Sequence, residues 1–156
     1  MNPESKNHEY FMKRCLELAH EAEKNLEVPI GAVIVHDGKI ISESSNKREK
    51  NHDATGHAEI LAIHDACQKL QSWRLSACDL YVTLEPCLMC AGALVQARIR
   101  NVYFGAYDPK GGALGSLYKI HEDTRLNHRF PAVGGVLGDE CGSLLSTFFK
   151  KKRAKS

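Results

Sequence analysis

The chain has 156 residues, of which 43% are hydrophobic and 26% are charged, a composition typical of one globular domain and not of a disordered chain. Its 21 Lys and Arg residues nearly balance 19 Asp and Glu, so the net charge of +2 gives no indication of a nucleic-acid partner. Charges interrupt the first thirty residues, and no run approaches the roughly 18 apolar residues of a membrane helix. We therefore expect a cytoplasmic protein without a membrane segment.

The first third of the chain predicts a helix followed by a hairpin. Apolar residues recur at three- and four-residue spacing from about Asn7 to Asn25, which indicates an amphipathic helix. The β-branched run Ile30–Val35 predicts a buried strand, and Ile40–Ser45 predicts a second one. Asp37-Gly38 lies between them and tolerates the positive φ of a tight hairpin turn.

The middle of the chain alternates between helix and strand. After a polar loop over Asn46–Gly56, the sequence predicts a helix at Ala58–Leu70 and a strand at Leu80–Leu84. An alanine-rich helix at Cys87–Ala97 and a fourth strand at Ile99–Gly105 follow.

The last third contains a Gly-rich segment at Asp108–Ser116, a fifth strand at Val133–Leu137 and a terminal helix from Glu140 to about Arg153. Residues 150–156 form a basic end to that helix. No composition shift marks a second domain, so we expect a single domain over residues 1–156. Strands alternating with helices predict a three-layer α/β architecture.

Two short motifs carry metal-binding chemistry. Cys87 and Cys90 are three residues apart at a predicted helix start, so both sulfurs lie on one face and can bind one ion. The positive end of the helix dipole favours their thiolate forms, and Pro86 suits the position just before the first turn. His57 opens another predicted helix. One nitrogen and two sulfur ligands favour Zn²⁺ over Mg²⁺ or Ca²⁺.

The number of ligands indicates the kind of site. A structural zinc site is normally closed by four protein ligands, whereas a catalytic site has three and leaves the fourth position to water. Zinc lowers the pKa of that water to about 7. Glu59 lies two residues from His57, close to the metal but pointing elsewhere, which suits a proton shuttle better than a ligand.

Two structural alternatives remain at this stage. Two cysteines three apart on a helix are sometimes simply buried. A closed structural site would recruit a fourth ligand, and His52, His64 and Cys141 are the candidates. His64 lies roughly 10 Å along the helix from His57, too far for a co-ligand. The four other cysteines lack a partner at metal spacing, and we expect them to pack in the core: Cys15, Cys67, Cys78 and Cys141.

His-Ala-Glu followed by Pro-Cys-x-x-Cys matches the signature of zinc-dependent nucleobase deaminases. Residues 83–93 (TLEPCLMCAGA) and 102–117 (VYFGAYDPKGGALGSL) resemble the tRNA-specific adenosine deaminases in particular. Residues 127–129 (NHR) and 144–149 (LLSTFF) extend the likeness to nearly the whole chain. The resemblance implies a cytidine deaminase-like α/β/α domain with a central mixed five-stranded sheet, forming a homodimer.

The resemblance also implies an activity. Such enzymes convert adenosine to inosine at the wobble position (34) of a tRNA anticodon, with one zinc ion per subunit. By the match of motifs, His57, Cys87 and Cys90 are the metal ligands and Glu59 is the general acid and base.

Five further positions match family contacts to the anticodon stem-loop. Asn46 corresponds to a contact with the flipped nucleotide, Asp108 and Lys110 to the anticodon-binding loop, and Phe149 and Arg153 to the terminal helix. The sequence itself gives weaker support, because a basic helix end can neutralise phosphates and an exposed phenylalanine can stack on a base.

Two rival functions remain open. One is the same chemistry on a free base or nucleotide such as guanine or cytosine, against which the 108–116 segment and the basic terminus argue. The other is a non-catalytic zinc-stabilised binding module, which would need a fourth protein ligand and no Glu59.

Overall fold

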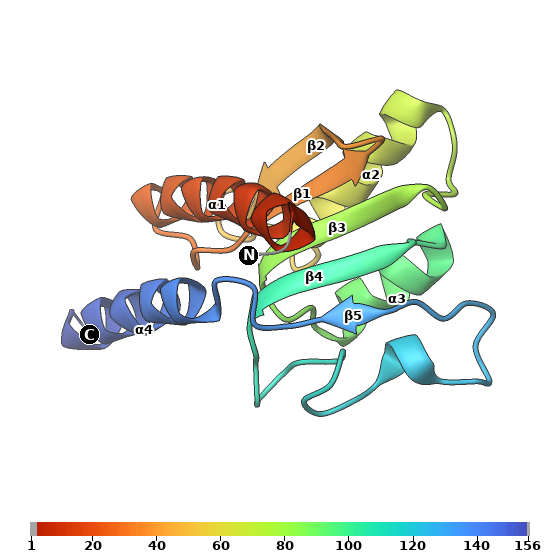
Figure 1. Cartoon of the computed structure of the whole chain (residues 1–156). Helices are drawn as coiled ribbons and strands as arrows, with labels where there is room; N and C mark the ends of the chain where they lie inside the picture. Colours follow the sequence, from red (N-terminus) through yellow and green to blue (C-terminus); the bar gives the residue numbers. More distant parts are fainter. Residues whose placement is uncertain (1–2, 156) are drawn as a thin grey trace.

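A five-stranded mixed sheet in the order β2-β1-β3-β4-β5 forms the centre of the molecule (Figure 1). A computed structural model describes residues 3–155, so the two ends of the expected domain, residues 1–2 and 156, lie outside the described part. The strands are β1 (Gly31–His36), β2 (Lys39–Ser45), β3 (Cys78–Leu84), β4 (Asn101–Ala106) and β5 (Ala132–Val133). The helices are α1 (Pro3–Lys24), α2 (Ala58–Leu70), α3 (Leu88–Ala97), the short 3₁₀ helix η1 (Ile120–Glu122) and α4 (Gly138–Ala154).

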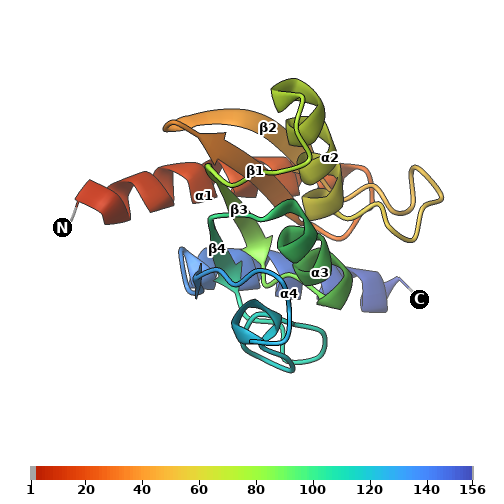
Figure 2. The ribbon, with the colours of Figure 1, turned by 90° about the vertical axis from the view of Figure 1, so that its right-hand side faces the viewer.

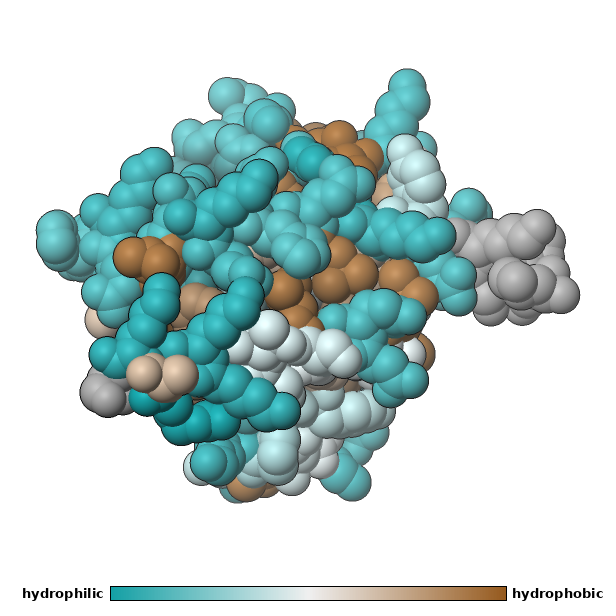
Figure 3. Space-filling view, turned by 90° about the vertical axis from the view of Figure 1, so that its left-hand side faces the viewer, coloured by the Kyte–Doolittle hydropathy of each residue, from teal (hydrophilic) through white to brown (hydrophobic). Residues whose placement is uncertain are grey.

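Helices cover both faces of the sheet, which confirms the predicted three-layer α/β/α architecture. Figure 2 shows α2 and α3 in front of the sheet and α1 and α4 behind it. Alanines of α2 and α3 pack on alternate residues of the strands, among them Leu80, Val82 and Phe104, in the larger core. On the other face, α1 and Cys141 of α4 enclose a smaller core around Val33 and Tyr81. Hydrophilic side chains cover most of the side of the molecule that lies on the left in Figure 1, with a smaller hydrophobic area among them (Figure 3).

The predicted hairpin between β1 and β2 is confirmed. Asp37 and Gly38 both have positive φ, +52° and +75°, which is the backbone of the tight turn that matches strand twist. The two strands pair antiparallel, with Gly31 opposite Ser45.

The strand bounds differ from the predicted ones by one or two residues in the first three strands, and the backbone explains the differences in the other two. The fourth begins at Asn101 instead of Ile99, because Arg98 adopts the left-handed conformation that ends α3 and the Ile99 amide bonds back to Leu94. The fifth covers only Ala132–Val133, so the predicted extent to Leu137 was wrong. Gly135, where φ is +88°, interrupts the regular strand, although the amides of Gly135 and Val136 still donate to Gly105 O and Phe104 O of β4 at 3.0 and 3.1 Å.

Three strands end at the same edge of the sheet. β1 is antiparallel to both β2 and β3, and β3 is parallel to β4, so β2, β3 and β4 run in one direction. The segments that follow their carboxyl ends are residues 46–57, 85–90 and 107–118. Such an edge is where ligands bind in open α/β sheets. Within residues 3–155, no helix is long and apolar enough to cross a membrane.

Helix α1 lies directly against the backbone of β1 at Gly31. A Cβ atom built at Gly31 would overlap the Cys15 carbonyl oxygen, the Ala19 amide nitrogen and Leu18 Cβ. The absence of a side chain therefore sets how closely this helix approaches the sheet.

We predict that Gly31→Ala lowers the free energy of unfolding by about 1–3 kcal/mol, because the extra methyl group has to displace main-chain atoms of α1. Chemical denaturation measures the effect. Gly142→Ala in α4 is the matched control, since its Cβ would only touch Ala106 at 3.9 Å. The control should gain about 0.5–1 kcal/mol from helix propensity. Equal stability of the two variants would contradict the close approach.

Candidate active site

The three predicted metal ligands come together at the starts of two helices. His57 is the N-cap residue of α2, and Cys87 is the N-cap residue of α3. Both have extended backbone and neither side chain caps its own helix, so the imidazole and the thiol point to the space between the helices. Cys90 lies in the first turn of α3 and is fully buried.

The spacing of the three ligand atoms fits a tetrahedral zinc ion. His57 Nδ1 lies 3.6 Å from Cys87 Sγ and 3.5 Å from Cys90 Sγ, and all three atoms lie within 4.8 Å of one another. Zinc bonds of about 2.3 Å to sulfur and 2.0–2.1 Å to nitrogen at a tetrahedral angle place the two ligands about 3.6 Å apart. Both nitrogen-to-sulfur distances therefore match those expected around a tetrahedral zinc ion.

Hydrogen bonds among the three donor atoms shift the pKa values of all three side chains. Hydrogen bonding from Cys90, aided by His57, lowers the pKa of Cys87 to about 3. The hydrogen bond to Cys87 raises the pKa of His57, and the one to Cys87 together with burial raises the pKa of Cys90. A divalent cation can replace those shared protons and accept an electron pair from each ligand atom.

No fourth protein ligand completes the cluster among residues 3–155. His52 and His64 are exposed, and Cys141 is buried in the core between α4 and the opposite face of the sheet. Cys15 and Cys78 are also buried and Cys67 is half-buried, as expected of packing residues. The three-ligand arrangement argues against the closed structural site and favours one with an open position.

Glu59 lies beside the ligand cluster in the first turn of α2 and is only 4% exposed. Burial raises the pKa of its carboxyl group to about 7, with the Cys87 charge acting in the same direction. A carboxyl group with a pKa near neutral can both accept and return a proton. The structure thus places a proton carrier next to the candidate metal site.

Four of the five predicted RNA-contact residues line one cavity of about 680 Å³. Asp108 and Lys110 come from the loop after β4, and Phe149 and Arg153 come from α4. Phe149 is 40% exposed, so one face of its ring is available for stacking. The Asp108 side chain also accepts backbone hydrogen bonds from Lys110 and Gly111, at 3.1 and 3.2 Å, and so shapes its own loop.

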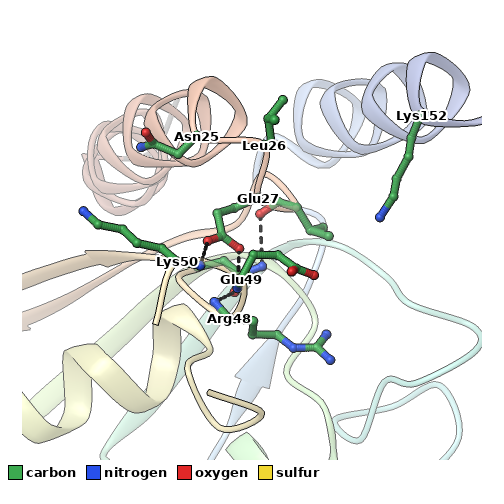
Figure 4. A pocket seen from close by; sticks show the side chains of 9 residues that line it. Asn25, Leu26, Glu27, Arg48, Glu49, Lys50 and Lys152 are labelled. Atoms are coloured by element: carbon green, nitrogen blue, oxygen red, sulfur yellow. Dashed lines mark hydrogen bonds between the residues drawn. The ribbon is translucent and has the colours of Figure 1, made fainter. Parts of the chain in front are cut away.

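The fifth residue, Asn46, lies in a neighbouring cavity of about 740 Å³ between the end of α1, the 46–57 loop and α4 (Figure 4). Val28 lines both cavities. The side-chain Nδ2 of Asn46 donates to Val28 O at 3.3 Å, and its side-chain Oδ1 accepts from the backbone amide of Arg48 at 3.2 Å. Asn46 is 4% exposed, so contact with a ligand needs the amide group to exchange one of these bonds.

Two buried glutamates hold the loops around the site, and the sequence prediction missed both. The Glu27 carboxylate accepts the amides of Glu49 and Lys50 at 3.0 and 2.8 Å (Figure 4). The Glu85 carboxylate accepts backbone amides of the loop after β4 in the same way. Burial acts to raise the pKa of Glu85, but hydrogen bonds led by Ser116 outweigh it and lower the pKa. In the sequence, the position of Glu85 between a predicted strand and Pro86 could have indicated that this glutamate has a structural role.

Comparison with known proteins identifies the family. Residues 6–153 match the model of the MafB19-like deaminases. The chain is 50% identical over 147 residues to the tRNA-specific adenosine deaminase of Bacillus subtilis, covering 94% of this chain and 91% of that protein.

Comparison with solved structures identifies the same family. One from a study of A-to-I editing by tRNA:A34 deaminases has a TM-score of 0.85 and 45% identity, covering 87% of this chain and 99% of the other. The guanine deaminase of Bacillus subtilis follows with a TM-score of 0.61 and 42% identity, covering 69% and 66%. The predicted fold and resemblance are thereby confirmed, and the chain belongs to the deaminase family that contains the tRNA-specific adenosine deaminases.

Proposed function

We propose that this protein is a zinc-dependent hydrolase that deaminates adenosine to inosine at position 34, the wobble position of a tRNA anticodon. The observation that carries the proposal is the three-ligand cluster of His57, Cys87 and Cys90 beside the buried carboxyl group of Glu59. The names of its relatives, at 50% and 47% identity, support the choice of substrate.

The mechanism assigns the proton transfers to Glu59. His57, Cys87 and Cys90 would hold the zinc ion, which supplies a Lewis acid that activates water for attack on C6 of adenine. The Glu59 carboxylate accepts a proton from that water and delivers it to the ring nitrogen next to C6. Glu59 then accepts the second proton, from the hydroxyl group added at C6, and passes it to the amino group, which leaves as ammonia when the C6–N bond breaks, so that adenosine and water give inosine and ammonia. Burial of Glu59 excludes bulk water from these transfers.

The RNA would lie in the two neighbouring cavities. Lys110 and Arg153 provide positive charge for phosphates, Asp108 shapes the loop that carries Lys110, and Phe149 offers an exposed ring for stacking. Asn46 would contact the nucleotide in the site. An anticodon loop nucleotide is already partly unstacked, so moving it into a buried site costs less than extracting a base from a duplex.

The second candidate is deamination of a free base such as guanine. The 42% identity to a guanine deaminase over 69% of the chain favours it, and the same ligands and Glu59 would serve either substrate. Purified protein incubated with an anticodon stem-loop RNA containing A34 distinguishes them, with free adenosine, adenine, guanine and cytosine in parallel. Inosine in the RNA supports the proposal, and product only from a free compound refutes it.

We also propose that residues 1–156 form a single deaminase domain, that the protein is a homodimer and that it is cytoplasmic. The single sheet across the described residues supports the first point, and the family supports the other two. Leu88, Leu117 and Tyr118 are each at least half exposed, at 52%, 53% and 50%, and lie near the site, where a second subunit would cover them. The mass in solution measures the assembly.

We predict that Glu59→Ala lowers kcat by roughly 10²–10⁴-fold while zinc content and the far-ultraviolet circular dichroism spectrum stay unchanged, because the proton carrier is lost but not a ligand. Single-turnover deamination of the stem-loop RNA measures the effect. Glu21→Ala, on the exposed side of α1, is the control and should be fully active. An active Glu59→Ala variant would refute the assignment of the proton transfers to Glu59, whereas a wild-type protein that binds zinc but deaminates nothing would favour the non-catalytic binding module.

Removal of the metal should abolish activity and lower the unfolding temperature, since the ligand cluster then holds α2 to α3 only through shared protons. Dialysis against a chelator followed by calorimetry and metal analysis measures both effects. One equivalent of Zn²⁺ per chain should restore the activity and the unfolding temperature, whereas the His57→Ala protein should bind no stoichiometric zinc. Full activity of metal-free protein would refute the metal assignment.

Phe149→Ala should raise KM for the stem-loop RNA about tenfold, because a stacked base contributes roughly 1–3 kcal/mol. Steady-state kinetics with the RNA measures the change. Tyr10→Ala removes another exposed aromatic ring, 67% exposed on α1, and should leave KM unchanged. Equal KM values for the two variants would remove Phe149 from the proposed RNA contacts.

A further inference from the structure

The buried carboxylate of Glu85 receives four hydrogen bonds from one loop. Oε1 accepts from the Asp108 amide at 3.0 Å and from the Ser116 hydroxyl at 2.5 Å. Oε2 accepts from the amides of Leu114 and Ser116, at 3.1 and 3.0 Å. The side chain is 2% exposed. Each oxygen has two donors, so the carboxylate is fully satisfied by the loop over residues 107–118.

This loop also pairs with the segment that carries the cysteine ligands. The Ala113 amide donates to Pro86 O at 2.9 Å, and Cys87 and Gly112 form an isolated antiparallel bridge. A Cβ atom at Gly112 would overlap the Glu85 carboxyl group, so only glycine lets the carboxylate enter the loop. Main-chain pairing and the Glu85 side chain thus join the same two segments.

We propose that Glu85 is a positioning residue that ties the 107–118 loop, with Asp108 and Lys110, to the strand end that leads to Cys87. The inference rests on the proposed function, because the loop is where the RNA is expected to bind. Glu85 does not touch the reacting atoms. It fixes the distance between the metal ligands and the RNA contacts, so its loss weakens RNA binding and leaves the metal site intact.

The isosteric change Glu85→Gln gives a specific defect. A carboxamide has one acceptor oxygen and one amino group, and the amino group can face a hydroxyl but not a backbone N–H. The favoured orientation keeps the oxygen on the amides of Leu114 and Ser116 and turns the amino group to the Ser116 hydroxyl. The Asp108 amide alone then loses its acceptor, and a buried donor without a partner is strongly unfavourable.

The experiment compares the full-length wild type with three variants. Glu85→Gln removes the acceptor for Asp108, and the milder Ser116→Ala removes one donor. Asp79→Asn is the control, since it changes a hydrogen-bonded carboxylate at the other end of β3, where Asp79 pairs with Arg100. For each protein, zinc content, kcat and KM for the stem-loop RNA and hydrogen exchange of residues 107–118 are measured.

For Glu85→Gln we expect about a tenfold higher KM, at least tenfold faster exchange at Asp108, and unchanged zinc content and kcat. Ser116→Ala should raise KM about threefold, and Asp79→Asn should match the wild type. Wild-type KM and exchange in Glu85→Gln would overturn the proposal, as would a drop in zinc content or thermal stability without a change in KM. If the wild type deaminates no RNA, the proposed function fails, and the exchange rates alone decide whether Glu85 holds the loop.

Discussion

The common direction of β2, β3 and β4 is the constraint on which the site depends. Their carboxyl ends meet at one edge of the sheet, so three segments far apart in sequence start from neighbouring points. Two of these segments lead directly into the starts of α2 and α3, where His57 and Cys87 are N-cap residues. Positive helix ends facing the same space favour the thiolate ligands of a metal. Reversing any one strand would separate the ligands.

Buried carboxylates extend this arrangement to the loops. Glu27 and Glu85 each sit in the interior with backbone amides of a neighbouring loop as hydrogen-bond donors. A buried charge is tolerated only with such donors, and loop amides away from regular structure need acceptors in turn. These hydrogen bonds satisfy both the buried carboxylates and the loop amides. They explain how the loops that carry the proposed RNA contacts can have a defined shape without belonging to the sheet.

The sequence predicted the local features well and the distant pairings poorly. The helices, the Asp37-Gly38 turn and the ligand motifs each depend on residues close together in the chain, where periodicity and spacing are readable. The predicted extent of β5 was wrong because the positive φ at Gly135, which interrupts the regular strand, cannot be recognised from the apolar pattern. Glu27 and Glu85 were missed because their donors are 22 to 31 residues away. The position of Glu85 between a strand and Pro86 could have marked that residue, but nothing in the sequence pattern identifies the hydrogen-bond donors of either glutamate.

The close approach at Gly31 means that the two helical layers are held at their distance from the sheet in different ways. Main-chain atoms of α1 occupy the space that a side chain at Gly31 would need, so the distance between α1 and the sheet depends on the absence of that side chain. The α2 and α3 layer rests instead on the methyl groups of Ala58, Ala62, Ala66 and Ala91. Larger side chains at these four alanine positions would push α2 and α3 away from the sheet and displace the candidate metal ligands that open both helices.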